Sequence, residues 1–290
     1  MLESLFRLAA RLPLRWLHAI GAGAGMLTLW LSPRFAARIA DNVRHAGVVP
    51  PGESPAGFRR RVSREIGKGL FELIAVWFRP DDEVSALVVD CRGWELIDGA
   101  LAQGRGILFL TPHLGCFDIS AIYTSMRIPL TVLYRPPKMR WLEPIMLSGR
   151  VRGQGQVVPT TIAGVRQMLK ALRSGQAVGL LPDHVPGSGE GAWAPFFGRP
   201  AFTMTLAGRL QGARDCAVIV AFARRLPRGA GYLLEFEAVE ENLAGSDGPA
   251  RLNGLLERLI RKCPEQYLWS YNRYKVPAGV EPPGDLGEAR

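Results

Sequence analysis

The chain has 290 residues, of which 48% are hydrophobic and 21% are charged, and these values exclude a wholly disordered protein. Its 36 Lys and Arg residues against 26 Asp and Glu residues leave a formal charge of +10. This excess favours an anionic partner, which could be a nucleic acid, an anionic membrane surface, or an acidic protein or phosphorylated substrate. The four cysteines are scattered without CxxC or Cys/His spacing, so we expect reduced thiols and no metal site.

The amino-terminal segment combines a basic stripe with an uncharged apolar run. Arg7, Arg11 and Arg15 recur every four residues and would lie along one side of a helix. Residues 16–32 contain no Asp, Glu, Lys or Arg, and their length is close to the lower limit for crossing a bilayer. We expect a retained membrane anchor here, which either spans the bilayer or lies in its surface. A cleaved signal peptide and a buried core helix are the alternatives.

Two serine–proline pairs follow, Ser32-Pro33 and Ser54-Pro55, and each predicts a helix start with Ser as the cap and Pro in the first turn. Beyond about residue 84, strand and helix patterns alternate, which predicts an α/β core with a largely parallel central sheet flanked by helices. The strands are expected at 86–90, 106–111, 130–134, 156–158, 177–181, 217–223 and 232–238. The helices are expected at 94–102, 118–125, 142–150, 162–173, 204–211 and 250–261. The last two strands are joined by a short Gly-rich turn, which predicts an antiparallel hairpin at one edge of the sheet.

The stretch GILFLTPHLGCFD at residues 106–118 holds the strongest candidate for a catalytic group. An apolar strand leads His113 into a turn, Gly115 allows a sharp change of direction, and Asp118 follows five positions after the histidine. An imidazole with an ordinary pKa of about 6.5 can accept a proton at neutral pH. A neighbouring carboxylate can fix its tautomer and stabilise its protonated form. His113 and Asp118 are therefore the candidate base and its orienting acid, against the alternative of a core histidine and a helix-capping aspartate.

Four cations are expected in loops near this pair. Arg135 and Lys138 follow the third predicted strand, and Arg150 and Arg152 stand where a predicted helix meets a loop. A guanidinium can bind a phosphate through two N–H groups, so these residues could hold a phosphorylated substrate. For each residue alone, a solvated surface charge is the alternative. Asp183 follows another predicted strand, where it could cap a turn or pair with one of the arginines.

Several other sites are excluded by their missing motifs. The chain has no GxSxG nucleophile elbow, no P-loop, no dinucleotide-binding GxGxxG at a strand–helix junction and no HExxH zinc motif. No RRM, KH or helix-turn-helix pattern is present either. We therefore expect no cofactor, no metal ion and no nucleic-acid partner.

Six motifs in a fixed order carry a resemblance to a known family. They are HLGCFD, YRPPK, GRVR, LLPDH, PFFGRPAFT and PEQYLWSYNRYK. In this order they resemble the late acyltransferases of lipid A biosynthesis, the lauroyl and myristoyl acyltransferases of Gram-negative bacteria, within the lysophospholipid acyltransferase-like superfamily. The Pro-Glu-Gly-Thr block of the wider glycerolipid acyltransferases is absent, which favours the lipid A branch. That branch often has Glu where this chain has Asp118, a change that shortens the side chain by one methylene and leaves its role intact.

The resemblance implies a glycerolipid acyltransferase-like fold, with residues 1–32 as the membrane anchor and residues 33–290 as the acyltransferase domain. It implies an acyl carrier protein-dependent O-acyltransferase that acylates a hydroxyl of a lipid A precursor. In this chemistry His113 would be the general base and Asp118 its partner. The implied partners are acyl carrier protein as the donor, a phosphorylated glycolipid acceptor and inner-membrane lipids. The implied location is the inner membrane, with the active site on its cytoplasmic face.

The resemblance also places substrate-binding residues. Arg152 and Asp183 fall on further active-site positions of the family, with Arg150 as the alternative to Arg152. Together with Arg135 and Lys138 they are expected to bind the substrates. Two other functions stay open. One is an acyltransferase of the same superfamily that acts on an ornithine lipid, a lysophospholipid or another glycolipid. The other is a non-catalytic, membrane-anchored lipid-binding protein.

Overall fold

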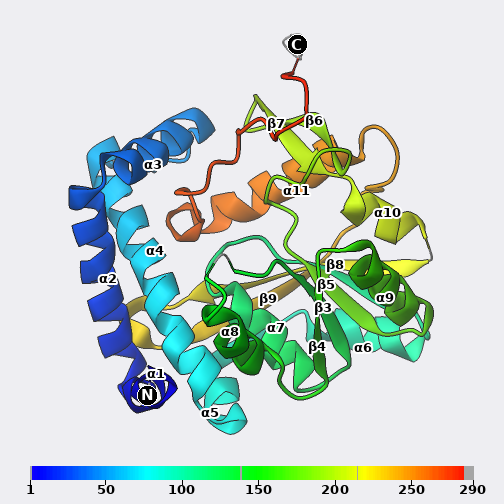
Figure 1. Cartoon of the computed structure of the whole chain (residues 1–290), viewed down its shortest axis with the longest axis horizontal. Helices are drawn as coiled ribbons and strands as arrows, with labels where there is room; N and C mark the ends of the chain where they lie inside the picture. The colour runs from blue at the N-terminus through cyan, green and yellow to red at the C-terminus, as the bar shows by residue number, and fades with distance from the viewer. Residues whose placement is uncertain (1, 138, 214, 284–290) are drawn as a thin grey trace.

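The computed structural model describes residues 2–137, 139–213 and 215–283. A central sheet of seven strands is covered by helices on both faces, and a group of N-terminal helices packs along one side (Figure 1). The strand order is β1-β9-β8-β2-β5-β3-β4, and every neighbouring pair is parallel except β8 with β9. The α/β class with a mostly parallel sheet, as the alternating sequence pattern predicts, is confirmed.

The strands of the central sheet are β1 (Val88–Arg92), β2 (Gly106–Leu110), β3 (Leu130–Tyr134), β4 (Gly155–Pro159), β5 (Ala177–Leu180), β8 (Cys216–Arg225) and β9 (Tyr232–Ala238). The predicted hairpin of β8 and β9 is present, but it does not form the edge, because β1 pairs in parallel with β9 and lies outside it. A separate two-stranded antiparallel sheet, β6 (Gly191–Phe196) and β7 (Arg199–Met204), is not expected from the sequence. Its residues Pro195 and Pro200, which lack an N–H group, face each other and weaken the strand pattern.

The helices fall into an N-terminal group and a group that covers the sheet. The first comprises α1 (Leu2–Ala9), α2 (Leu14–Leu31), α3 (Pro33–Ala46), α4 (Pro55–Phe78) and α5 (Asp81–Ala86). The second comprises α6 (Trp94–Ala102), α7 (Phe117–Ser125), α8 (Leu142–Arg150), α9 (Ile162–Arg173), α10 (Leu206–Gly212) and α11 (Gly248–Lys262). Two short 3₁₀ turns, η1 (Pro227–Gly229) and η2 (Pro264–Gln266), follow β8 and α11. The predicted caps are present, because Ser32 and Ser54 accept hydrogen bonds from the N–H groups of Phe35 and Gly57.

The core consists of two apolar layers separated by the sheet. Strand β2 is buried on both faces, so its sequence is a continuous apolar run rather than an alternating one. Ile107 and Phe109 point into the layer beneath α6 and α7, whereas Leu108 and Leu110 point into the layer beneath α9, α10 and α11. Strand β2 therefore crosses the centre of the molecule, and its carboxyl end delivers the His113 turn.

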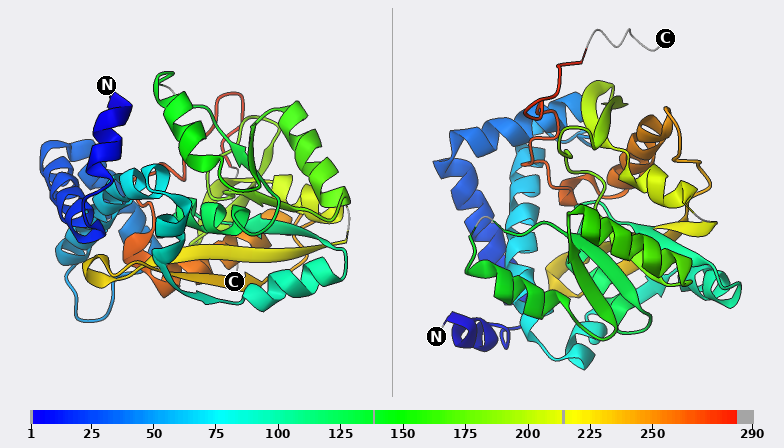
Figure 2. Two further views of the ribbon diagram at one scale, coloured as in Figure 1. Left: turned by 90° about the horizontal axis from the view of Figure 1, so that it is seen from below. Right: turned by 45° about the vertical axis from the view of Figure 1, so that its right-hand side comes forward.

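Helices α2 and α4 lie side by side and approach at backbone contact (Figures 1 and 2). A Cβ atom on Gly67 of α4 would lie only 1.9 Å from the carbonyl oxygen of Gly21 on α2. One turn further along, the Ser63 hydroxyl donates a 2.7 Å hydrogen bond to the carbonyl oxygen of Gly25. The glycines that weaken the apolar run as an isolated helix are therefore the residues that let it pack against α4.

Among the residues that the structure describes, no helix has both the length and the apolar character needed to cross a membrane. The membrane anchor expected at residues 1–32 is thus not confirmed by the fold. Leu14, Leu17 and His18 of α2 are buried against the rest of the chain, while Trp16 and Trp30 of the same helix are exposed. Helix α2 is one wall of the folded protein and presents an apolar outer face.

Candidate active site

His113 meets Asp183 because the two strands that precede them are neighbours in register. Leu110 at the end of β2 pairs with Leu180 at the end of β5, and His113 and Asp183 each follow three residues later. The Nδ1 atom of His113 lies 2.8 Å from Oδ1 of Asp183, and the His113 backbone N–H donates a 2.9 Å bond to Oδ2. Burial alone would raise the pKa of Asp183, but the His113 imidazole and its hydrogen bonds lower that pKa well below its ordinary value. The ionised carboxylate accepts a hydrogen bond from the Nδ1–H group of His113, so the lone pair of the neutral imidazole lies on Nε2.

The turn after His113 is fixed by backbone contacts. Gly115 has a φ of +62°, and a Cβ atom there would lie 2.0 Å from the carbonyl oxygen of Ala223. The Gly115 N–H donates a hydrogen bond to the carbonyl oxygen of Gln266, and the Leu268 N–H donates one to the carbonyl oxygen of His113; each bond is 3.1 Å long. The end of β8 and the segment after α11 therefore hold the histidine turn on both sides.

Asp118 does not hold the imidazole as the sequence spacing led us to expect. It is the second residue of α7, and its carboxylate is directed to α8, where Arg150 donates bonds of 2.6 Å and 3.2 Å to its two oxygens. Asp183 takes the position at Nδ1 of His113 that we assigned to Asp118. The reason is geometric, because the helix that starts at Phe117 turns the Asp118 side chain away from the ring. Asp118 still lines the same cavity as His113.

Arg152, which we expected to bind substrate, has its guanidinium bonded to the end of α4 and to Asp81 in this structure. Its guanidinium donates to the carbonyl oxygens of Arg79 and Trp77 at the end of α4 and pairs with Asp81 at 2.6 Å. Helix α8 ends at Arg150 and the next residue is extended, so the two arginines leave the backbone in different directions. The Arg150 guanidinium pairs with Asp118 instead, and its side chain stays partly accessible.

The other predicted substrate-binding residues have different positions. Arg135 is exposed just past the carboxyl end of β3, and its positive charge contributes to lowering the pKa of His184. Lys138 lies outside the described residues. Asp183 has only 1% of its side chain exposed, so it reaches substrate only through His113. The sequence analysis offered a turn cap or an ion pair with an arginine for Asp183, whereas the structure shows its carboxylate bonded to the backbone N–H and the imidazole of His113.

An aromatic stack, not predicted from the sequence, packs against the face of His113. The ring of His184 lies parallel to it, with centroids 3.8 Å apart, and the ring of Tyr271 stacks on the far side of His184 at 4.1 Å. Phe117 meets the His113 ring edge-on at 4.8 Å. The available signal was that His184 directly follows Asp183, and that Tyr271 belongs to the carboxyl-terminal motif of the six.

Two cavities lie close to the start of α7 and share two lining residues, Phe117 and Asp118. The larger, of about 420 Å³, is bounded by α2, α4 and the turn, and its lining includes His113, Leu70, Leu73 and Leu268. The smaller, of about 50 Å³, is lined mainly by apolar side chains of the sheet and α7, with Gly179 at one wall. Phe117 and Asp118 line both cavities, whereas Arg150 lines the smaller one.

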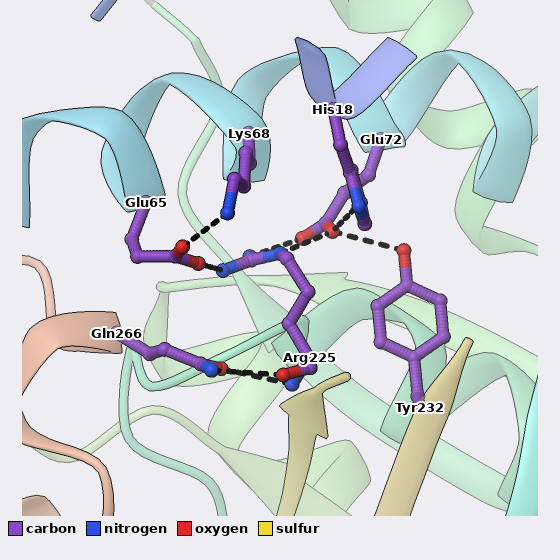
Figure 3. Close-up of polar contacts among 7 residues, drawn as sticks. All are labelled: His18, Glu65, Lys68, Glu72, Arg225, Tyr232 and Gln266. Atoms are coloured by element: carbon purple, nitrogen blue, oxygen red, sulfur yellow. Dashed lines mark hydrogen bonds and ion pairs between the residues drawn. The ribbon is translucent and has the colours of Figure 1, made fainter. Parts of the chain in front are cut away.

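A polar cluster that includes buried Glu72 and Arg225 forms part of the lining of the larger cavity. Figure 3 shows the hydrogen bonds and ion pairs of this cluster. Glu72 of α4 accepts hydrogen bonds from Arg225 of β8 and Tyr232 of β9, and its carboxylate lies 3.0 Å from His18 of α2. Burial alone would raise the pKa of Glu72, but Arg225 and His18 together lower this pKa to about 2. The side-chain amide of Gln266 forms two hydrogen bonds with the backbone of Arg225, so the cluster also connects to the segment that holds His113.

The geometry provides a proton acceptor beside a cavity. His113 has a carboxylate behind Nδ1, a stacked ring against its face and a cavity beside it, which is the arrangement of a general base. Within the described residues, no group of three or more His, Cys, Asp or Glu side chains is placed to hold a metal ion. Burial raises the pKa of the Cys116 thiol well above its ordinary value, so this cysteine of the turn is held as an unreactive thiol.

Comparison with known proteins gives the family of this chain. The profile of the family described as "Bacterial lipid A biosynthesis acyltransferase" matches residues 4–276. The lipid A biosynthesis lauroyltransferase of Escherichia coli K12 is 31% identical over 94% of this chain and 90% of its own length. The palmitoleoyltransferase of the same organism is 29% identical over 74% of this chain and 71% of its own length. A lipid A biosynthesis acyltransferase of Haemophilus influenzae is 26% identical over 94% of this chain and 88% of its own length. With a profile match that spans nearly all its length, the chain belongs to the bacterial lipid A biosynthesis acyltransferase family.

Proposed function

We propose that this protein is an acyl carrier protein-dependent O-acyltransferase that moves a fatty acyl chain onto a hydroxyl of a lipid A precursor. The family supports acyl transfer, and the names of the relatives support lipid A as the acceptor class. The observation that carries the chemistry is the His113–Asp183 pair beside the larger cavity. It supplies a base with a fixed tautomer where a lipid hydroxyl can reach it.

The reaction needs a base because a lipid hydroxyl is protonated at neutral pH. His113 removes the hydroxyl proton through Nε2 as the oxygen attacks the thioester carbonyl carbon. The tetrahedral adduct then collapses, the C–S bond breaks, and the departing thiolate takes the proton from the imidazolium. General base catalysis of this kind contributes about 10²–10⁴-fold to the rate. Asp183 stabilises the imidazolium during the step and holds the ring in place.

We assign the two cavities to the two lipid parts of the reaction. The smaller cavity has an apolar wall made by strands β2, β3 and β5 and by α7, which suits a single acyl chain of the donor. The larger cavity lies against α2 and α4, whose outer faces carry exposed apolar side chains, which suits an acceptor that enters from a membrane. Asp118 lines both cavities and its partner Arg150 lines the smaller one, so the pair would contact the reacting end of the acyl chain.

The basic surface supports anionic partners. The formal charge of +10 complements an acidic acyl carrier protein and a phosphorylated acceptor. Arg135 is exposed beside the site, and we propose that it and Lys138 contact phosphate groups. Because Arg150 is paired with Asp118, its part in anion binding is the smaller one.

We also propose attachment to the inner membrane, with the active site on the cytoplasmic face. Residues 1–32 would form the attachment and residues 33–290 the acyltransferase domain. Apolar side chains project outward along α1, α2 and the link between them, including Leu5, Leu8, Leu12, Trp16, Ile20, Leu27, Trp30 and Leu31. Exposed Arg11 and Arg15 lie among them and suit anionic headgroups.

Membrane attachment is tested by introducing negative charge on this face, because deleting α2 would open the core. The double substitution Leu27→Glu, Trp30→Glu should shift the protein from the pellet to the supernatant when it is sedimented with anionic vesicles. Ile162→Glu on α9 is the matched control, since Ile162 is equally exposed but lies away from the N-terminal helices. Equal sedimentation of the double variant and the control would place the attachment elsewhere on the protein.

Acyl transfer is tested directly with acyl carrier protein thioesters and a phosphorylated, acylated glucosamine disaccharide. Mass spectrometry should show the acceptor gaining one acyl group with the wild-type protein. Total lipids from cells with and without the gene identify the acceptor in vivo. Acylation of an ornithine lipid or a lysophospholipid instead would select another acceptor class, and no transfer to any of these lipids would favour a lipid-binding protein.

A further inference from the structure

His184 contacts His113 through its ring face. The two imidazoles are nearly parallel, with an angle of 12° between planes and 3.8 Å between centroids. Tyr271 stacks on the opposite face of His184 at 4.1 Å, and its hydroxyl oxygen accepts a 2.9 Å bond from the Val185 N–H. The Nε2 atom of His184 is buried and has no hydrogen-bond partner among the described residues. His184 therefore contacts His113 through its ring face and not through a ring nitrogen.

The surroundings of His184 keep its ring neutral. Burial, followed by the nearby charges of His113, Arg135 and Lys275, lowers the pKa of His184 to about 3, and only Asp183 acts in the opposite direction. At neutral pH the ring therefore carries no charge. The ring is thus a flat, neutral aromatic surface between His113 and Tyr271.

Asp183 alone does not fix the His113 ring. The hydrogen bond at Nδ1 restrains the rotation of the ring about its Cβ–Cγ bond, but a single hydrogen bond tolerates some tilt of the ring plane. The parallel contact with His184 limits this tilt on one face, and the edge-on contact with Phe117 limits it from another side. Tyr271, held by its bond to the Val185 N–H, keeps His184 from moving away.

We propose that His184, supported by Tyr271, is a positioning residue that fixes the plane of the His113 imidazole and thereby aims its Nε2 lone pair at the acceptor hydroxyl. This inference rests on the proposed role of His113 as the base. The positioning role requires an aromatic ring at position 184 and no ring nitrogen. A misdirected base reduces the rate of the chemical step and leaves the binding of substrates largely intact.

The test compares His184→Ala with His184→Phe in the full-length protein. His184→Ala removes the ring, so kcat should fall by about 10–100-fold with KM for donor and acceptor near the wild-type values. His184→Phe keeps a neutral flat ring, so kcat should return close to the wild-type value. His45→Ala is the matched control, because His45 also contacts a tyrosine ring but lies on α3.

A second readout does not depend on turnover. The chain has only four histidines, so selective ¹⁵N labelling resolves the ring signals of His113 by NMR. The Nδ1 proton held by Asp183 should exchange slowly with water in the wild-type and His184→Phe proteins and rapidly in His184→Ala. Melting temperature and far-UV circular dichroism confirm that each variant is folded.

Three results would overturn the inference: wild-type kcat in folded His184→Ala, a kcat in His184→Phe as low as in His184→Ala, or a rise in KM alone. The second would mean that His184 acts through a ring nitrogen. Failure of the proposed function has a different signature. Wild-type turnover in His113→Ala would disprove the role of His113 as the base, whatever the His184 variants do.

Discussion

The buried Glu72 cluster predicts a specific loss of stability in Glu72→Gln. This change keeps the shape of the side chain but removes the charge that faces Arg225 and His18 (Figure 3). Glu72 is 1% exposed and joins α4 to α2, β8 and β9, so the pair with Arg225 has little screening by water. Among the residues that the structure describes, Arg225 would keep Glu65 as its one acidic partner.

Two independent estimates of the cost agree. The pKa of Glu72 falls from its ordinary 4.5 to about 2, and at about 1.4 kcal/mol per pKa unit this corresponds to about 3 kcal/mol of stability above pH 5. Removing one partner of a buried ion pair costs about 3–5 kcal/mol. We therefore expect the free energy of unfolding to fall by about 3 kcal/mol at pH 7.

The dependence on pH follows from the sign of the shift. A carboxyl group whose pKa is depressed in the folded state stabilises the fold above its unfolded pKa and loses this contribution as the pH falls through the folded value. The gap between the wild-type protein and Glu72→Gln should therefore be constant above about pH 5. It should shrink between pH 4.5 and about 2.

Urea unfolding followed by tryptophan fluorescence measures the gap, with Glu53→Gln as the control. Glu53 pairs with Arg61 on the surface, where such pairs contribute about 0–1 kcal/mol. If Glu72→Gln unfolds with the same free energy as the control, or if its gap is unchanged down to pH 3, the reasoning about the cluster is refuted.

Three further predictions concern packing and specificity. Gly67→Ala places a methyl group against the α2 backbone and should lower the free energy of unfolding in urea by about 1–3 kcal/mol. Gly23→Ala, whose added methyl group meets nothing within 4 Å, should leave it unchanged, and equal effects would contradict the close α2–α4 packing. Arg152→Ala should lower the melting temperature with KM for the acceptor unchanged, because its bonds go to the end of α4; a higher KM at unchanged stability would restore a substrate-binding role. Gly179→Leu should fill the smaller cavity and shift the preferred donor toward shorter acyl chains in competition assays. An unchanged chain-length profile would place the acyl chain elsewhere.

The sequence predicted the features that depend on local pattern. The alternation of apolar strands and amphipathic helices was sufficient for the α/β class, and the Ser-Pro pairs predicted two helix starts that the structure confirms. The contact of His113 with Asp183 depends instead on the register of β2 with β5, two strands that are separated by β3 and β4 in the sequence. Proximity in sequence favoured Asp118, and the direction of α7 decided against it.

Two other features lay beyond the sequence for the same reason. His18 stood alone in an apolar run, and nothing near it in the sequence indicated that Glu72 and Arg225 would meet it in the interior. Arg152 matched a family motif, but its hydrogen bonds go to the end of α4, which only the packed structure brings close. In each case a long-range contact decided the role of a side chain whose residue type was already suggestive.

The most direct test of the proposed chemistry is the rate of acyl transfer by folded His113→Ala, measured by mass spectrometry with an acyl carrier protein thioester and the lipid acceptor. Because His113 would be the base and Asp183 the carboxylate behind it, kcat/KM should fall by at least about 10²-fold in His113→Ala and also strongly in Asp183→Asn. Transfer by His113→Ala at the wild-type rate would contradict the assignment of His113 as the general base.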